Sequence, residues 1–244
     1  ISSIPNAFGM KGFGDISRVA IWTSICCTCV AIGFVVVDLG GPLRLWELFV
    51  YSNLSSPLMW DIIVLGTYLI LSCVYLWAQV RAEAGKMSHT ALRVISVVAL
   101  VCAVLVHSVT AWIFGLQIAK EGWYSAIMAP IFVASAMDSG LALLLCVLAA
   151  LKKARLFETS RELMASLAGL LATCIAVDAF FIFCEVLTMA YPGAAGAETL
   201  VLMTSGPTSP FFWFEIVGGL VVPFLVLVFA KNRERTGLVV GASV

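Results

Sequence analysis

Two ionisable residues fall in the middle of long apolar segments. His107 lies in VHSVTAWIFGLQ, and Asp138 lies in the next apolar segment, FVASAMDSGLALL. Ionisable groups are costly inside a bilayer, where they mark functional sites by default. An imidazole also exchanges protons near neutral pH. We therefore take His107 and Asp138 as the candidate catalytic pair. The alternative for each is a structural hydrogen bond, for His107 to a neighbouring helix and for Asp138 to Ser135 or His107.

Three further carboxylates, Asp178, Glu185 and Glu215, lie in later apolar segments. Asp178 and Glu185 are seven residues apart, which puts them on one face of a helix. Because two carboxylates on one buried face are costly, they are candidates for a proton relay that includes Glu215. Gly218 and Gly219 share the face of Glu215 and leave room there for a neighbouring helix or a flat ligand. The alternative for Glu215 is an interfacial anchor.

The residue types argue against several chemistries. His89, the other histidine, lies in a predicted loop, so we expect no bis-histidine haem and no metal site. The eight cysteines are scattered along apolar segments and do not suggest the four gathered thiolates of an iron–sulfur cluster. The remaining ligand class supplies its own redox chemistry, as a quinol does, with protons taken by bases and electrons by a partner. A proton-coupled secondary transporter or a proton channel would use the same polar residues.

The elements that position these residues are predicted to be membrane helices. The chain is 62% hydrophobic and 11% charged, with a mean hydropathy of +1.07, whereas soluble domains carry about 25% charged residues. Apolar segments of about 20 residues that cross lipid must be helical. The expected fold is all-α, a polytopic membrane helical bundle forming one domain over residues 1–244, incomplete at both ends. A seventh span is expected to begin near Thr236, after six full spans at 19–37, 58–80, 94–118, 124–151, 163–190 and 211–230.

Basic residues alternate between the two ends of these spans. Twelve of the 14 Lys and Arg residues lie in connections on one side, and only Arg44 and Lys120 lie on the other. The positive-inside rule then places Ile1 in the cytoplasm and the loops at 38–57, 120–123 and 191–210 outside. The last of these is predicted to be either a docking surface or a mobile loop. The zero net charge gives no indication of nucleic acid.

Depth follows from this topology by counting residues along each span. His107, Asp138 and Asp178 fall near mid-membrane, and Glu185 and Glu215 fall nearer the outer surface. The ionisable residues therefore form a funnel that opens outward. Because the connection at 120–123 is short, we expect the two helices that carry His107 and Asp138 to pack side by side at one pocket.

Five stretches carry a resemblance to a known family. They are DLGGPLRLWEL, SSPLMWDIIVLGTYL, HSVTAWIFGLQIAKEGWYSAIMAPIFVASAMDSGLALL, FCEVLT and PFFWFEIVGGLVVPF, in that order over nearly the whole chain. The sequence resembles the NrfD/PsrC family, the membrane-anchor subunits of polysulfide reductase-type and related quinone oxidoreductase complexes. The form HSVTAWIFGLQ is most similar to the branch of sulfite-reduction-associated and menaquinone-reductase complexes.

The resemblance implies a quinone-interacting subunit of anaerobic respiration rather than an enzyme alone. It implies eight to ten helices in a prokaryotic cytoplasmic (inner) membrane, without haem or iron–sulfur cluster in this chain. Menaquinone or menaquinol would exchange electrons with an outward-docked ferredoxin-like iron–sulfur subunit. That subunit would in turn serve a molybdopterin or multihaem cytochrome subunit.

The resemblance also implies a quinone pocket in the first helical bundle, near the outer surface. By motif, His107 takes the place of the family's mid-helix histidine, and Asp38 and Arg44 belong to its D-L-G-x-P-x-R stretch. Glu185 and Glu215 match its later acidic positions. The sequence departs at Gly41, where Arg is usual, and the family's first helix has no counterpart here. The resulting quinone-binding set is His107, Ser135, Asp138, Asp38 and Arg44.

Overall fold

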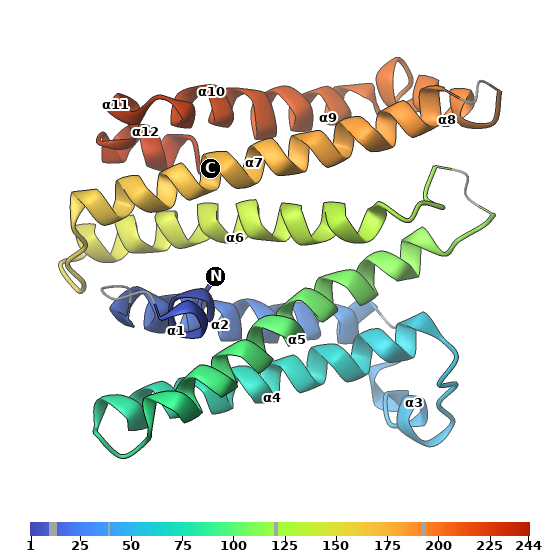
Figure 1. Cartoon of the computed structure of the whole chain (residues 1–244). Helices are drawn as coiled ribbons and strands as arrows, with labels where there is room; N and C mark the ends of the chain where they lie inside the picture. The colour runs from blue at the N-terminus through green and yellow to red at the C-terminus, as the bar shows by residue number, and fades with distance from the viewer. Residues whose placement is uncertain (10–13, 39, 120–121, 192–193) are drawn as a thin grey trace. The chain divides into compact units, whose positions relative to one another are not determined.

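The computed structural model describes residues 1–9, 14–38, 40–119, 122–191 and 194–244 (Figure 1). In these ranges the regular elements are helices and no strand occurs, which confirms the all-α fold class. The chain divides into two compact units, unit 1 (Ile1–Ile113) and unit 2 (Phe114–Val244). The single domain over residues 1–244 stays a prediction.

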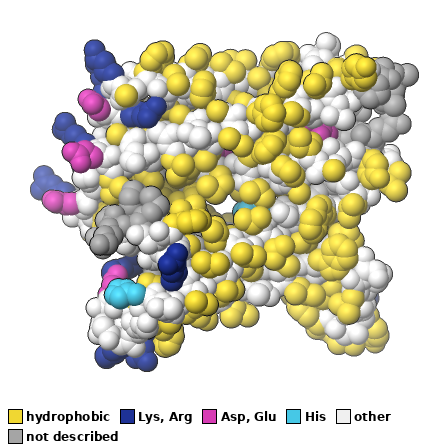
Figure 2. Space-filling view, viewed as in Figure 1, with side chains coloured by type: hydrophobic (Ala, Val, Ile, Leu, Met, Phe, Trp, Pro, Cys, Tyr) yellow, Lys and Arg dark blue, Asp and Glu magenta, His cyan; other side chains and the backbone are white. Residues whose placement is uncertain are grey.

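Among the residues that the structure describes, six helices are long and apolar enough to cross a membrane, which confirms the predicted number of full spans. Large apolar side chains such as Phe34, Ile70 and Phe180 are exposed along them. Figure 2 shows apolar side chains covering the lengths of the helices, with charged side chains gathered at helix ends. Such exposure is typical of a surface that faces lipid. The six spans are Ile16–Asp38, Pro57–Glu83, His89–Gly115, Met128–Lys153, Arg161–Ala190 and Ser209–Val228.

Unit 1 holds the first three spans. Its helices α2 and α4 pack against each other, and α4 and α5 are antiparallel because a connection of a few residues, 84–88, joins them. Arg18, Arg81 and Arg93 lie at one end of these helices, which we call the basic end of unit 1. The elements are α1 (Ile4–Phe8), α2 (Gly14–Asp38), η1 (Pro42–Arg44), α3 (Glu47–Val50), α4 (Pro57–Glu83) and α5 (His89–Gly115).

Unit 2 holds the other three spans, with α6 and α7 packed along each other. The sixth span is composite, because a π-helical segment, η2, precedes Pro223. Proline has no N–H for the helix ladder, and such local re-winding is tolerated in membrane helices. The elements are α6 (Met128–Lys153), α7 (Arg161–Ala190), α8 (Ala194–Thr204), α9 (Ser209–Trp213), η2 (Phe214–Val221), α10 (Val222–Val228), α11 (Ala230–Arg233) and α12 (Thr236–Gly241).

Local signals in the sequence explain where the long helices begin and end. Pro57 occupies the first turn of α4, where its missing N–H costs nothing, and Gly85 follows the helix with φ of 68°. At α7, Ser160 Oγ accepts a 3.2 Å hydrogen bond from Leu163 N and caps the helix.

Two predicted connections differ from the structure. The connection between α5 and α6 comprises residues 116–127 and is longer than the predicted turn, because the apolar residues that flank 120–123 do not continue either helix. The predicted loop at 191–210 contains α8. Pro130 lies inside the fourth span, in the first turn of α6. Lys11 and Lys120, which entered the charge count, lie outside the described residues.

Candidate functional site

In unit 1 a polar cluster joins the start of α4 to the end of α5. Thr110 Oγ1 donates a 2.6 Å hydrogen bond to Asp61 Oδ1. His107 lies one helical turn before Thr110 and interacts electrostatically with Asp61. Two antiparallel helices thus bring the Thr110 hydroxyl into contact with the Asp61 carboxylate, and the His107 imidazole lies near enough to interact electrostatically. We call Asp61, His107 and Thr110 the Asp61 cluster.

Asp61 is the residue that sequence reasoning did not select. It lies near the start of the predicted span at 58–80. The sequence does contain a signal that points to Asp61. His107 and Thr110 are three residues apart, which puts both on one face of α5. An acidic residue near the start of the preceding antiparallel helix lies at the same level as that face.

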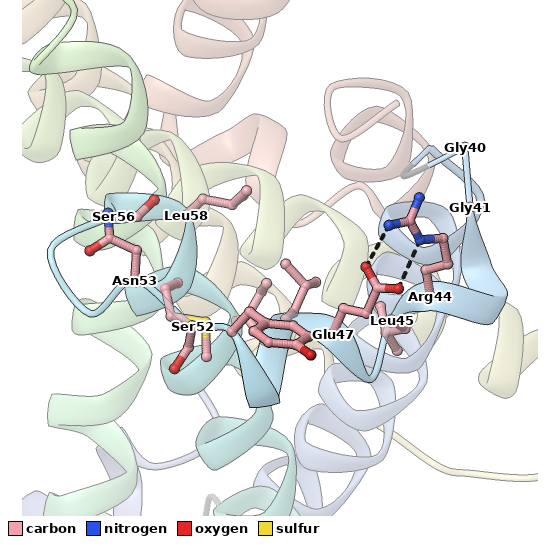
Figure 3. A pocket seen from close by; sticks show the side chains of 13 residues that line it. Gly40, Gly41, Arg44, Leu45, Glu47, Ser52, Asn53, Ser56 and Leu58 are labelled. Carbon is pink, nitrogen blue, oxygen red and sulfur yellow. Dashed lines mark hydrogen bonds and ion pairs between the residues drawn. The ribbon is translucent and has the colours of Figure 1, made fainter.

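A pocket of about 660 Å³ lies in the connection between α2 and α4 (Figure 3). The side chains of Leu58, Met59 and Ile62 line it from the first turns of α4. Arg44 lines it from η1, and its Nε and Nη2 donate hydrogen bonds of 2.9 and 2.8 Å to the two carboxylate oxygens of Glu47. These bonds raise the pKa of the Arg44 guanidinium, which stays charged. The pocket therefore combines an apolar side with an exposed ion pair.

Of the two predicted quinone-binding residues in this region, Asp38 and Arg44, only Arg44 lines the pocket. Arg44 lines this pocket, as do Gly40 and Gly41 of the same motif. Asp38 ends α2 with an exposed side chain and does not line the pocket.

In unit 2 the carboxyl groups of Asp138 on α6 and Asp178 on α7 form a side-chain hydrogen bond. Two ionised carboxylates at this separation would repel each other, so a shared proton would stabilise the pair. Asp138 Oδ1 also accepts a 2.6 Å bond from Ser139 N. Asp178 is only 3% exposed, and its Oδ1 has no hydrogen-bond partner among the described residues.

The other predicted residues of unit 2 fall into two places. Glu215, on η2, interacts electrostatically with Asp178 and so belongs with the Asp138–Asp178 pair. Glu185 Oε2 accepts a 2.6 Å hydrogen bond from Ser125 Oγ in the connection before α6. Ser135 lies one turn before Asp138, and its side chain is exposed.

His107 and Asp138 lie in different units, His107 in unit 1 and Asp138 in unit 2. Their meeting at one pocket was inferred from a connection of only a few residues, and the connection is longer than that. The shared pocket stays a prediction. Among the described residues no group of three or more His, Cys, Asp and Glu side chains could hold a metal ion.

The whole chain, residues 1–244, matches the polysulphide reductase family NrfD. The chain belongs to the NrfD family. The resemblance seen in the motifs is thereby confirmed.

Three NrfD relatives show how far the similarity extends. The chain is 30% identical to a protein assigned as a dimethyl sulfoxide reductase membrane subunit in Halobacterium salinarum, over 100% of this chain and 60% of that protein. It is 28% identical to the Hdr-like menaquinol oxidoreductase integral membrane subunit of Archaeoglobus fulgidus, over 95% of this chain and 58% of that protein. It is 24% identical to one of the chains of polysulfide reductase from Wolinella succinogenes, over 79% of this chain and 64% of that protein. The chain therefore spans less than two thirds of the length of these relatives.

Proposed function

We propose that this chain is the quinone-interacting part of a membrane subunit in a respiratory oxidoreductase complex. It binds menaquinol or menaquinone and exchanges electrons with an iron–sulfur partner subunit of the ferredoxin-like type. A molybdopterin or multihaem cytochrome subunit completes the complex. The relatives support this, because two are named as parts of reductases and one as a membrane subunit of a menaquinol oxidoreductase.

The Asp61 cluster is the observation that carries the proposal. A quinol that is oxidised loses two electrons and two protons, and a nearby base must take each proton. The neutral imidazole of His107 is such a base. Asp61 interacts with His107 and is held in place by the 2.6 Å bond from Thr110. In the reverse direction the same groups return protons to the quinone oxygens as electrons arrive.

The pocket beside η1 is the proposed place of entry for the quinone. Its volume of about 660 Å³ lies within the range of small-molecule sites, about 300–1,000 Å³. Ile62, the neighbour of Asp61 in α4, contributes to its apolar side. The ion pair of Arg44 and Glu47 offers a polar contact for a head group.

We propose a proton relay in unit 2 that consists of Asp138, Asp178 and Glu215. A separate polar contact is formed by Glu185 and Ser125. Asp138 and Ser135 also remain proposed quinone contacts, alongside His107, Asp38 and Arg44. The relatives, which come from Halobacterium salinarum, Archaeoglobus fulgidus and Wolinella succinogenes, support a prokaryotic cytoplasmic membrane. The charge distribution supports an orientation with Ile1 on the cytoplasmic side. The electron carriers are proposed to reside in the partner subunits.

Mutation of the Asp61 cluster tests this function. We expect His107→Gln and Asp61→Asn to lower reduction of a short-chain naphthoquinone by the purified complex at least tenfold, because each removes a proton-exchanging group. Assembly is measured by co-purification of the partner subunits. The control is His89→Gln, since His89 is exposed at the first residue of α5 and should tolerate the change. Near-normal turnover in both cluster variants would remove the cluster from the mechanism.

A proton-coupled transporter or proton channel is the second candidate, and the Asp138–Asp178 pair favours it. Paired carboxyl groups inside a helical bundle are groups that such proteins use to carry protons. This alternative predicts proton flux through the chain in liposomes without any quinone or partner subunit. The oxidoreductase proposal predicts co-purifying redox subunits and quinone-dependent turnover.

A further inference from the structure

The helices of unit 2 carry an excess of positive charge at the end where α6 ends and α7 begins. Figure 1 shows α11 at this end, and α11 packs against α7. Among the described residues no carboxylate forms an ion pair with a basic side chain of this end. The positive charge is therefore available to an anionic ligand. The acidic residues here are Glu158, Glu162 and Glu234, and the basic residues, which we call the basic end of unit 2, are Lys152, Lys153, Arg155, Arg161, Lys231, Arg233 and Arg235.

Arg233 is held in place by the end of a neighbouring helix. Its Nε donates a 2.5 Å hydrogen bond to Leu227 O, and its Nη2 donates a 2.8 Å hydrogen bond to Val228 O. These carbonyls belong to the last residues of α10, which ends because Phe229 is extended, with ψ of 118°. A cation is favourable at such a helix end, where the last carbonyls have no donor in the helix. The guanidinium is therefore anchored in one orientation.

Capping α10 uses only one edge of the Arg233 guanidinium. A guanidinium has five N–H groups, and the bonds to the two carbonyls use one on Nε and one on Nη2. Nη1 donates no hydrogen bond to any residue that the structure describes, and the side chain is only half-buried. The N–H groups of Nη1 and the second N–H of Nη2 thus form a free edge. Paired N–H groups of this kind bind two oxygens of a phosphate.

A glycine on α7 leaves the space that this free edge needs. A Cβ added at Gly169 would lie 2.8 Å from Arg233 Nη1, so any larger residue would have to displace the guanidinium. Ser166 lies one turn earlier on the same face of α7, and its side chain is exposed. The same stretch of α7 therefore offers a close approach for the guanidinium and a hydroxyl donor.

The depth of this stretch matches the headgroup layer of a bilayer. α7 has 30 residues, about 45 Å at about 1.5 Å per residue, whereas a bilayer core is about 30 Å thick. The first turns of α7 therefore extend beyond the hydrocarbon. Gly169 lies about 12 Å along the helix from Arg161, so Arg233 lies near the boundary of the core. Lipid phosphates lie just beyond that boundary, where a long basic side chain reaches them.

We propose that Arg233, Gly169 and Ser166 form a binding site for the phosphate of an anionic phospholipid. The free edge of Arg233 binds the phosphate oxygens, and Ser166 donates its hydroxyl. The basic end of unit 2 attracts a headgroup that carries net negative charge over a zwitterionic one. Leu170 and Val177, farther along α7, are exposed and offer apolar contacts for the acyl chains. The site involves neither quinone nor electrons and is independent of the proposed function.

Photochemical cross-linking of lipid to the purified complex in detergent tests this site. The probe is a phosphatidylglycerol with a diazirine in its acyl chain, and mass spectrometry identifies the labelled peptides. We expect the wild-type complex to be labelled within residues 163–177. Unlabelled phosphatidylglycerol should compete with the probe. Phosphatidylcholine and inorganic phosphate at the same concentration should not.

The Gly169→Ala variant is the sharpest test, because it crowds Arg233 Nη1 and leaves every charge unchanged. The added methyl meets the end of a flexible side chain, so the fold should survive. We expect Gly169→Ala and Arg233→Gln each to lower labelling of this segment at least tenfold. The control is Arg235→Gln, which removes one charge from the same end at an exposed position. Its labelling should stay within twofold of the wild type, and circular dichroism checks the folding of each variant.

Three results would overturn the lipid site. The first is wild-type labelling in Gly169→Ala together with equal losses in Arg233→Gln and Arg235→Gln, because it would indicate general attraction to positive charge. The second is competition by inorganic phosphate, which would indicate a site for a free anion. The third is no labelling within residues 163–177 of the wild type, which would indicate that protein covers this face. Quinone turnover is measured separately, so none of these results decides the proposed function.

Discussion

Asp178 is the most deeply buried of the acidic residues proposed for the relay, at 3% exposed. Its carboxyl depends on Asp138 for its hydrogen bond, and its second oxygen has no partner among the described residues. A buried carboxyl is stable only while it is paired or protonated. The pair is therefore expected to respond strongly to changes that remove one carboxyl and weakly to changes that preserve the hydrogen bond.

The Asp178→Ala variant should destabilise the protein by roughly 1–3 kcal/mol, the cost of leaving a buried polar partner unsatisfied. Asp178→Asn should cost less, because its amide still donates a hydrogen bond to Asp138. Thermal unfolding in detergent, followed by the loss of the helical circular dichroism signal, measures both. Glu198→Gln, at an exposed position on α8, is the control. Equal stability of Asp178→Ala and the wild type would contradict a structural contribution of the pair.

At this scale the sequence predicted which residues are polar inside the membrane but not which of them meet. Asp178 and Glu185 share a face of α7, as their spacing predicts, yet they bind different partners, Asp138 and Ser125. Asp61 became a candidate only through Thr110, 49 residues away. Which side chains pair between two helices depends on how the helices are aligned along each other. The spacing of residues within one helix does not determine that alignment.

The long helices show how far local signals determine an element. The serines Ser56 and Ser160 both precede a membrane helix in extended conformation, but only Ser160 makes a capping bond with its side chain. The sequence pattern is similar at both positions. The difference arises from the orientation of the side chain relative to the first turn.

This contrast gives a matched pair of variants. Ser160→Ala should lower the free energy of unfolding by about 1 kcal/mol, the usual cost of losing an N-cap hydrogen bond. Ser56→Ala should change it much less, since no capping bond is lost there. Thermal unfolding in detergent compares the two directly. A larger loss for Ser56→Ala would contradict the capping assignment.

The connection between α5 and α6 shows where local signals fail. Residues around 120–123 are bordered by apolar and aromatic side chains, including Trp123 and Tyr124, that resemble continuing membrane helix. In the structure α6 begins only at Met128, and Phe114 packs edge-on against Trp123 with ring centroids 5.4 Å apart. The apolar residues are used for packing within a connection. Hydropathy alone does not separate these two uses.

Across the whole chain, the alternation of basic residues is the pattern that orients the spans. The α6–α7 connection carries Arg155, and Lys152 and Lys153 end α6, whereas α8 in the next connection carries no basic residue. A cytoplasmic excess of Lys and Arg orients membrane proteins, so the α6–α7 connection is expected inside and α8 outside. The direction in which the funnel of ionisable residues opens depends on this orientation.

Single cysteines test this orientation in a variant that lacks the eight native ones. Glu158→Cys places a thiol in the α6–α7 connection, and Glu198→Cys places one on α8, and both positions are exposed. In intact cells a membrane-impermeant thiol reagent should label Glu198→Cys and leave Glu158→Cys unlabelled until the membrane is permeabilised. Labelling of Glu158→Cys alone in intact cells would reverse the topology. The Asp61 cluster would then open toward the cytoplasm.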